Sequence, residues 1–283
     1  MTTLVFFHAH PDDECISTGG VMARAAAAGF RVVLVVATRG ERGEPTPGVL
    51  ADGEPLWERR ISESYASAKI LGVQRVEFLG YVDSGMMGEP SNTSPYSFWT
   101  AQVDAAAGRL ASILTEEDAQ MLTIYDDNGG YGHPDHIMVH RVGLRAAEIA
   151  GTPRVFQTTM NRDHFSRMLS QFVEQGQVPP AIEAALEVAE DETGTTAEEE
   201  FLGSLDQFGK PEAEITHAID VSDLVGLKRE AMLAHRSQIA DDSWFLTMDP
   251  DSFTAAFGTE WFIETGVERA EGEAFGNTLW AQG

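Results

Sequence analysis

The sequence predicts an α/β fold, in which a mostly parallel sheet is covered by helices on both faces, and three observations support this prediction. Short apolar runs of strand length alternate with segments of helix length through the first 160 residues. The apolar runs are continuous, as in strands that are buried on both faces of a parallel sheet. Glycines or Gly/Pro-rich stretches mark the ends of the elements. Together these features indicate repeated βαβ units.

The predicted strands are the apolar runs themselves. In chain order they cover residues 4–9, 31–38, 76–81, 119–125 and 154–160. The helices predicted between and after them cover residues 17–30, 56–72, 98–117 and 136–151. The first helix is alanine-rich, begins near Ser17 or Thr18 and ends at Gly29, whereas the second has helical periodicity and ends at Gly72. This alternation is typical of a Rossmann-like layout, whose ligands bind at the carboxyl ends of the strands.

The regular alternation ends near residue 161. Residues 161–214 are acidic and rich in turn-forming residues, so we expect an excursion or cap outside the sheet. Regular secondary structure is predicted again after this segment, as a strand over 215–221 and a helix over 224–239. We therefore expect a Rossmann-like catalytic core over 1–160 that residues 215–283 complete as part of the same domain, with a smaller C-terminal cap region.

The composition limits the partners of this chain. Its formal net charge is −26 at pH 7, and such a surface repels nucleic-acid phosphates and anionic membranes. No apolar stretch is long enough for a membrane span, and the first residues lack the features of a signal peptide. The single cysteine, Cys15, excludes an internal disulfide and fits a reducing compartment. We expect a cytoplasmic protein with a small-molecule substrate and no nucleic-acid partner, while a homo-oligomer stays open.

Two polar clusters directly follow predicted strands. The first is HAHPDDE, residues 8–14, and the second is YDDNGGYGHPDH, residues 125–136. The carboxyl ends of parallel strands share one edge, so we expect the clusters to converge on one crevice. Crowded acidic side chains repel one another and are costly to bury unless a cation lies among them. We therefore predict a metal site held by His10, Asp13 and His136, a set that suits catalytic zinc and that ferrous iron also tolerates.

Other residues of the clusters suit hydrolysis by a metal-activated water. A divalent cation lowers the pKa of a water molecule and polarises a carbonyl group. Asp12 is expected to act as the general base, and His133 to stabilise the oxyanion or to protonate a leaving amine. Asp135 is predicted to hold the His133 ring in the correct tautomer, and Tyr131 to donate a hydrogen bond to the oxyanion.

The remaining histidines have other expected roles. His140 lies one helical turn after His136 and is the main rival metal ligand, because two histidines at this spacing on a helix can bind zinc. His8 is expected to be structural, and a position in the pocket is the less favoured alternative for His235. Ordinary polar roles are expected for His164 and His217, and packing roles for the tryptophans Trp99, Trp244, Trp261 and Trp280.

The motifs resemble those of the LmbE-like deacetylases, a family that includes N-acetylglucosaminyl-phosphatidylinositol deacetylase (PIG-L). The resemblance rests on AHPDDE (9–14) and HPDH (133–136), with support from the segment 79–86 and a weaker echo, AHRSQI, at 234–239. It implies a zinc-dependent hydrolase that removes an acetyl group from an N-acetylglucosamine-type amine. The ERGE and DSGM segments are similar to the mycothiol-pathway branch, which comprises an acetylglucosaminyl-inositol deacetylase and a mycothiol S-conjugate amidase.

The resemblance also implies roles for individual positions. His10, Asp13 and His136 match the family's metal ligands. Asp12 matches its general base, and His133 matches the histidine that assists at the oxyanion or the leaving group. The chemistry of the clusters and the family motifs therefore point to the same five residues.

Residues for substrate binding are implied in the same way. Tyr131, Glu44, Arg60 and Asp83 fall where members that act on glucosaminyl-inositol compounds have pocket residues. A surface ion pair is the alternative for Arg60, because this residue lies on a predicted helix. Ser17 stands where the amidase branch has a lysine, and in this it agrees with the deacetylase branch.

Three functions are compatible with these features, and N-deacetylation of a glucosaminide, favoured as the glucosaminyl-inositol type, is the leading one. The second keeps the chemistry but cleaves a larger glucosaminide amide, such as a mycothiol S-conjugate. The third is a non-catalytic nucleotide-binding Rossmann module. That module requires a glycine-rich turn after the first strand, where this chain has HAHPDDE instead.

Overall fold

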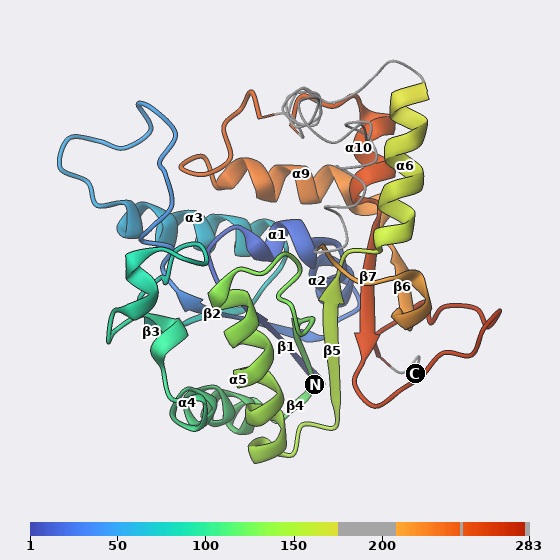
Figure 1. Cartoon of the computed structure of the whole chain (residues 1–283), viewed down its shortest axis with the longest axis horizontal. Coiled ribbons are helices and arrows are strands. Elements are labelled where there is room, and N and C mark those ends of the chain that lie inside the picture. The colour runs from blue at the N-terminus through green and yellow to red at the C-terminus, as the bar shows by residue number, and fades with distance from the viewer. Residues whose placement is uncertain (175–207, 244–245, 281–283) are drawn as a thin grey trace, which may run out of the picture.

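The computed structural model describes residues 1–174, 208–243 and 246–280, and within these ranges seven strands form one sheet. The strands are β1 (Thr3–His8), β2 (Arg31–Thr38), β3 (Arg75–Tyr81), β4 (Ala119–Tyr125), β5 (Arg154–Thr159), β6 (His217–Asp220) and β7 (Thr259–Glu264). Their spatial order is β3-β2-β1-β4-β5-β7-β6. The first five are parallel, and β7 pairs antiparallel with both β5 and β6. The predicted mostly parallel α/β fold is confirmed (Figure 1).

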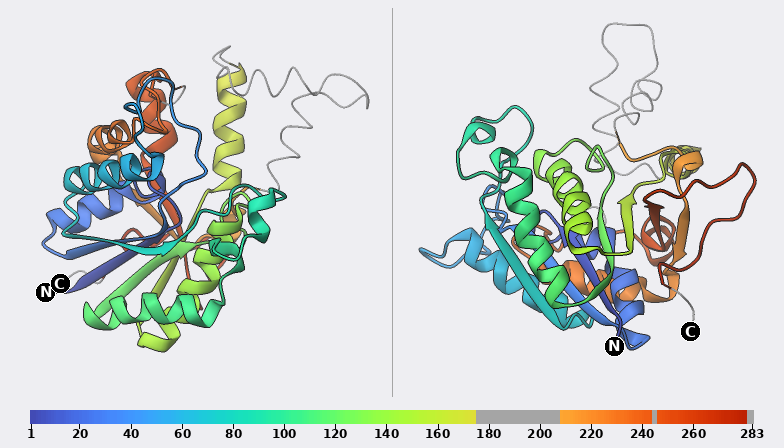
Figure 2. Two further views of the ribbon diagram at one scale, coloured as in Figure 1. Left: turned by 90° about the vertical axis from the view of Figure 1, so that its left-hand side faces the viewer. Right: turned by 90° about the horizontal axis from the view of Figure 1, so that it is seen from below.

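Helices cover both faces of this sheet (Figures 1 and 2). On one face lie α4 (Val103–Glu116) and α5 (Pro134–Ala150). On the other lie α1 (Asp13–Ser17), α2 (Gly19–Ala27), α3 (Leu56–Ile70), α9 (Val225–Ala234) and α10 (Pro250–Phe257). β1 shows why its sequence is continuously apolar: Val5 and Phe7 belong to the core under α4 and α5, whereas Leu4 and Phe6 belong to the opposite core.

The connections of the sheet place a crevice between β1 and β4. These two strands are neighbours, although the chain visits β2 and β3 between them. From β1 the chain moves to one side of the sheet, and from β4 it moves to the other, which is the arrangement that leaves a ligand-binding crevice at the carboxyl ends. β1 ends at His8 and β4 ends at Tyr125, so both polar clusters begin at this crevice.

The structure differs from the predicted elements in the first helix. Residues 17–30 do not form one helix, because α1 ends at Ser17 and α2 begins at Gly19. The break is Thr18, whose φ of −138° is not helical and whose hydroxyl contacts His8 Nε2 at 2.8 Å. His8 is fully buried and also bonds the Tyr125 hydroxyl, which fits its expected structural role.

The C-terminal part of the chain contributes more regular structure than the sequence indicated. β7, α10 and α6 (Arg162–Glu174) were not predicted, and β7 inserts between β5 and β6 rather than extending the parallel series. Of the predicted acidic excursion over 161–214, residues 175–207 lie outside the described residues, as does Trp244. The division of the chain at 160 and 214 stays a prediction. In the described part of the chain, no helix is long and apolar enough to cross a membrane.

An ion-pair cluster joins the amino ends of β2 and β3 to the end of α4, away from the crevice. Glu117 accepts hydrogen bonds from Arg31 at 2.5 and 2.8 Å and from Arg75 at 2.7 Å. The bonds from Arg31, and then those from Arg75, lower the pKa of Glu117 to about 2 although burial opposes this. A carboxyl group with a lowered pKa stabilises the fold above its unfolded pKa, and this stability is lost as the pH falls through the folded pKa.

We therefore expect Glu117→Gln to lower the free energy of unfolding by roughly 2 kcal/mol at pH 7. The difference from wild type should shrink as the pH falls from 4.5 toward 2, because the wild-type carboxyl then takes up a proton. Urea unfolding at pH 7, 5 and 3 measures this. The control is Glu116→Gln, which removes a neighbouring carboxylate that is 63% exposed and should cost less than about 0.5 kcal/mol. Equal losses at pH 7 and pH 3 would contradict the assignment.

Candidate active site

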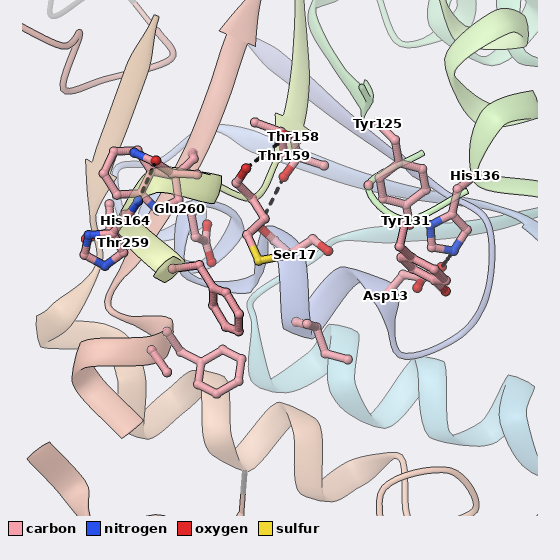
Figure 3. Close-up of a pocket in the computed structure, with 18 of the residues that line it drawn as sticks. Asp13, Ser17, Tyr125, Tyr131, His136, Thr158, Thr159, His164, Thr259 and Glu260 are labelled. Atoms are coloured by element: carbon pink, nitrogen blue, oxygen red, sulfur yellow. Dashed lines mark hydrogen bonds and ion pairs between the residues drawn. The ribbon is translucent and has the colours of Figure 1, made fainter. Parts of the chain in front are cut away.

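The crevice brings residues from both polar clusters into contact. Asp13 Oδ2 lies 3.4 Å from His10 Nδ1 and 3.5 Å from His136 Nε2. Asp13 opens α1 after β1, and His136 lies in the first turn of α5 after β4. Both histidines are buried. The three residues that the sequence selected as metal ligands are thus gathered at one point, and Figure 3 shows Asp13 beside His136.

A hydrogen bond on the side away from Asp13 fixes the orientation of the His136 ring. Its Nδ1 lies 3.1 Å from the carbonyl oxygen of Gly129, and a carbonyl only accepts, so Nδ1 carries the proton. Nε2 therefore presents a lone pair toward Asp13, and this buried atom has no hydrogen-bond partner among the described residues. Gly129 has φ +64°, and a Cβ there would lie 2.5 Å from the His136 Cβ. Only glycine allows this close approach.

His10 is oriented by two carboxylates. Its Nε2 lies 3.2 Å from Asp135 Oδ2 and 3.6 Å from Asp83 Oδ1, so the proton sits on Nε2 and the lone pair of Nδ1 points to Asp13. Asp135 is held in turn by Ser84, which donates to it from the backbone N–H at 2.9 Å and from the hydroxyl. The carboxylate of Asp135 thus serves His10.

This corrects the role that the sequence suggested for Asp135. Its carboxylate does not hold the His133 ring, because it is already bonded to His10 and Ser84. The backbone N–H of Asp135 contacts His133 instead, at 3.1 Å from Nδ1. His133 is the N-cap residue of α5 and therefore uses its ring to accept this N–H. The sequence could not show whether His133 bonds the carboxylate or the backbone N–H of Asp135, because both groups belong to the same residue.

The arrangement of acceptors tests whether these residues suit a metal ion. Two imidazole lone pairs and a carboxylate oxygen face one another, and such groups repel unless a positive charge lies among them. Hydrogen bonds with Asp13, Asp135 and Asp83 raise the pKa of His10 well above its ordinary value although burial opposes this, so the position favours a positive charge beside Asp13, either a second proton on Nδ1 or a bound cation in its place. The donor set, with the outer carboxylates that orient it, fits a divalent cation.

Asp12 combines an unusual backbone with a carboxylate that makes no capping hydrogen bond. Its φ of +99° is rare for a residue other than glycine and stores strain of about 1–3 kcal/mol. Although Asp12 is the N-cap residue of α1, its side chain makes no capping hydrogen bond. The carboxylate instead contacts Arg60 at 3.2 Å. Burial, against the opposing charge of Arg60 and with added repulsion from Asp13, raises the pKa of Asp12 to about 6.

His133 is a neutral hydrogen-bond donor in this setting. Burial, together with the neighbouring His10 and His136, lowers the pKa of His133 to about 4. Because Nδ1 accepts the Asp135 N–H, the proton of the neutral ring lies on Nε2. The His133 and His10 rings pack edge to face, 4.6 Å apart. Tyr131 closes the same corner, with its ring 5.0 Å from that of His136.

Other groupings of metal-binding residues occur in the described part of the chain. His10, His133 and His136 can place one nitrogen each within 4.8 Å of one another, but the lone pair of His133 Nδ1 is engaged by a backbone N–H. Asp83 and Asp135 can join His10 in a second group. The rival ligand His140 contacts the Tyr125 carbonyl oxygen through Nδ1, at 3.0 Å.

A cavity of about 450 Å³ extends from this cluster, a volume within the range of small-molecule sites. Figure 3 shows Asp13, Tyr131 and His136 at one end and His164 and Glu260 at the other. Much of its wall is apolar and comes from α1, α6, α10 and β7, through Ile16, Phe165, Met168, Ala256, Phe257 and Trp261. Trp261 was predicted only to pack, yet it lines this cavity.

The cavity also has polar walls that the sequence did not reveal. Lys228 and Glu260 line it and form a buried ion pair at 2.7 Å. Glu260 additionally accepts the backbone N–H groups at the start of α2. His164, expected to be an ordinary polar residue, and Asn161 line the same region. No motif marks these residues, because they become neighbours only when β7 joins β5.

The residues predicted to bind substrate lie in different places in the structure. Ser17 lines the cavity. Asp83 is 4% exposed and contacts His10, so it lies behind the predicted metal ligand. Glu44 is exposed on the loop before α3 and is absent from the cavity wall in the described residues.

Arg60 is buried on α3, at 4% exposure, so the surface ion pair that its helical position allowed is not formed. Its guanidinium donates to the carbonyl oxygens of Gly40 and Pro11, at 2.7 and 2.6 Å, and to Asp12. These bonds tie the loop after β2 to the loop after β1. Arg60 therefore contacts the predicted base directly.

A crevice in a parallel sheet, a donor set that suits a cation and an adjacent, partly buried carboxylate are features of metal-dependent hydrolases. The family described as PIG-L, GlcNAc-PI de-N-acetylase, matches residues 5–147, half of the chain. The chain therefore belongs to the PIG-L family, as the sequence motifs predicted.

Curated relatives cover most of the chain. The 1D-myo-inositol 2-acetamido-2-deoxy-alpha-D-glucopyranoside deacetylase of Acidothermus cellulolyticus is 40% identical over 270 residues, which span 92% of this chain and 88% of that protein. The enzyme of the same name from Streptomyces griseus is 41% identical over 264 residues, 88% of this chain and 78% of that protein. Among solved structures, N,N'-diacetylchitobiose deacetylase from Pyrococcus horikoshii has a TM-score of 0.57 at 22% identity and covers 93% of this chain and 84% of its own. That likeness supports the fold.

Proposed function

We propose that this protein is a metal-dependent N-deacetylase that removes the acetyl group from an N-acetylglucosaminyl-inositol compound. The observation that carries the proposal is the convergence of His10, Asp13 and His136, whose unshared electron pairs face one point. Membership of the PIG-L family supports the reaction, and the names of the relatives support the substrate. The partner is then a small amino sugar, and we place the reaction in the cytoplasm.

Zinc is the cation that we propose for this site, and ferrous iron also suits two imidazoles and a carboxylate. When bound, such a cation polarises the amide carbonyl and lowers the pKa of water. The protein supplies His10, Asp13 and His136 as ligands. Asp83 and Asp135 keep the His10 ring in the tautomer that presents Nδ1 to the ion.

Asp12 is the proposed general base. At neutral pH a carboxylate with a pKa of about 6 is ionised, yet it is more basic than an exposed aspartate, so it accepts a proton from the attacking water. His133 donates a hydrogen bond from Nε2 to the developing oxyanion and keeps its proton, because its ring is neutral. The proton that Asp12 has taken from the water passes to the leaving amine. Tyr131 has a phenolic hydroxyl at the same corner and donates a second hydrogen bond to the oxyanion.

The cavity favours a second candidate, hydrolysis of a glucosaminide amide with a larger acyl group. An acetyl group ends in one methyl group, whereas the cavity beside Asp13 and His136 has about 450 Å³ and an apolar wall. A bulky acyl group, such as that of a mycothiol S-conjugate, would find contacts there. Ser17 favours the smaller substrate, because the amidase branch has a lysine at its position.

A side-by-side assay decides between the two. Zinc-loaded protein is given N-acetylglucosaminyl-inositol or a mycothiol S-conjugate, and the released amine is measured. We expect kcat/KM to be at least roughly tenfold higher for the acetyl compound, as one differently filled pocket can produce. The opposite ratio would assign the larger amide as the substrate. Absence of amine from both would overturn the proposed reaction.

A further inference from the structure

The strained backbone of Asp12 is hydrogen-bonded to the side chain of Glu14, two residues further on. Glu14 is fully buried, and its Oε2 accepts the backbone N–H of Asp12 at 2.9 Å. An N-cap aspartate ordinarily accepts N–H groups of the first turn through its own carboxylate. Here the Asp12 carboxylate makes no such bond, and a first-turn glutamate instead bonds back to the N-cap N–H, as in one half of a capping box. With this bond in place the Asp12 carboxylate takes no part in capping, and it contacts Arg60 instead.

Glu14 is itself held by residues from two distant helices. Its Oε1 lies 2.7 Å from His235 Nε2 and accepts the Ser67 hydroxyl at 2.6 Å. Ser67 belongs to α3, and His235 is the C-cap residue of α9, which packs beside both α1 and α3 (Figure 1). Both contacts are on one oxygen, so the other oxygen remains available to the Asp12 N–H.

The His235 ring makes one polar contact in the described part of the chain, the one with Glu14. It is fully buried, and its Nδ1 has no hydrogen-bond partner among the described residues. It does not line the cavity, so the less favoured expectation that it reaches the pocket is wrong. Its sequence segment, AHRSQI, stood out among the motifs, yet the metal site and the cavity leave its histidine unexplained. The only ring nitrogen with a described polar contact points at Glu14.

We propose that Glu14 and His235 form a positioning pair that fixes the backbone of Asp12 and thereby aims the general base. His235 restrains Glu14, Glu14 restrains the Asp12 N–H, and Asp12 accepts the proton. The inference rests on the proposed function, because it requires Asp12 to act as a base. Neither residue of the pair touches the substrate in this scheme.

The first test is His235→Ala. We expect kcat to fall roughly 10- to 100-fold, with KM and bound zinc per chain changed less than twofold. His235→Gln keeps an N–H donor near the position of Nε2, so it should restore most of kcat. The matched control is Ser237→Ala in the same buried turn, which removes a 2.6 Å bond to Glu63 but no contact with Glu14, and kcat should stay within twofold.

The second test is a double-mutant cycle with Asp12→Asn. If His235 acts through Asp12, adding His235→Ala to Asp12→Asn should change the residual rate less than twofold. An equal loss in both backgrounds, a parallel loss of zinc, or an unchanged kcat in His235→Ala would each overturn the inference. If His235→Ala does not fold, His235→Gln with near-normal kcat and Ser67→Ala with a several-fold lower kcat support it, and unchanged kcat in Ser67→Ala overturns it. An inactive wild-type enzyme would instead reject the proposed function.

Discussion

Replacing Asp12 by asparagine should nearly abolish turnover while leaving the fold intact or more stable. Asparagine tolerates a positive φ better than most residues, so the backbone at +99° can be retained. It also removes a partly buried charge next to Asp13 and Glu14, whose repulsion contributes to the raised pKa of Asp12. The amide cannot accept the proton, so kcat should fall by roughly 10²- to 10⁴-fold.

Three measurements separate this outcome from general damage. Amine release from the N-acetylglucosaminide gives kcat, zinc analysis gives the ion content, and thermal unfolding gives the stability. Zinc content should stay the same, and the melting temperature should not fall. The control is Asp127→Asn. Asp127 belongs to the second cluster, its side chain is 64% exposed, and it pairs with Lys210. The kcat of this variant should stay within twofold of wild type. Turnover near the wild-type rate in Asp12→Asn would reject Asp12 as the base.

Removal of the metal ion should abolish activity and lower stability together. A ligand that binds only the folded state stabilises it, by about 2.7 kcal/mol at a concentration one hundred times its Kd. Chelated protein should therefore melt at a lower temperature, and added zinc should restore both the melting temperature and amine release. In His136→Ala, one of the converging lone pairs is missing, so added zinc should raise the melting temperature little and activity should fall at least roughly 10³-fold.

His140→Ala is the matched control, because this histidine lies one turn further along α5 and bonds the Tyr125 carbonyl oxygen. It should retain the zinc-dependent rise in melting temperature. If His140→Ala loses this rise and His136→Ala keeps it, the rival ligand is the correct one. A zinc-dependent rise in both variants would place the ion elsewhere.

The sequence predicted the parts of this molecule that depend on a single strand and the residues directly after it. His10, Asp13 and His136 could be selected because parallel strands bring their carboxyl ends to one edge. The direction of the Asp135 carboxylate could not be predicted, because it depends on the Ser84 loop after β3. Glu14 and His235 are 221 residues apart in the sequence, and neither segment has a local pattern that predicts their contact.

The C-terminal elements were the hardest to predict for a related reason. β7 reads TEWFIE, a short stretch that mixes aromatic and acidic residues, and its strand character comes from pairing with β5 on one side and β6 on the other. Because β7 was missing from the predicted sheet, so was the cavity wall at Trp261. Where the local sequence pattern was weak, pairing with neighbouring strands therefore determined the secondary structure.

The origin of the cavity wall has a consequence for how this enzyme can diversify. The family match ends at residue 147, whereas α6, α10 and β7 come later in the chain. The proposed catalytic residues and most of the apolar cavity wall thus come from separate stretches of the chain. Swapping α6, α10 and β7 between relatives, with His235 kept, should alter which acyl groups are accepted and leave the proposed catalytic residues as they were.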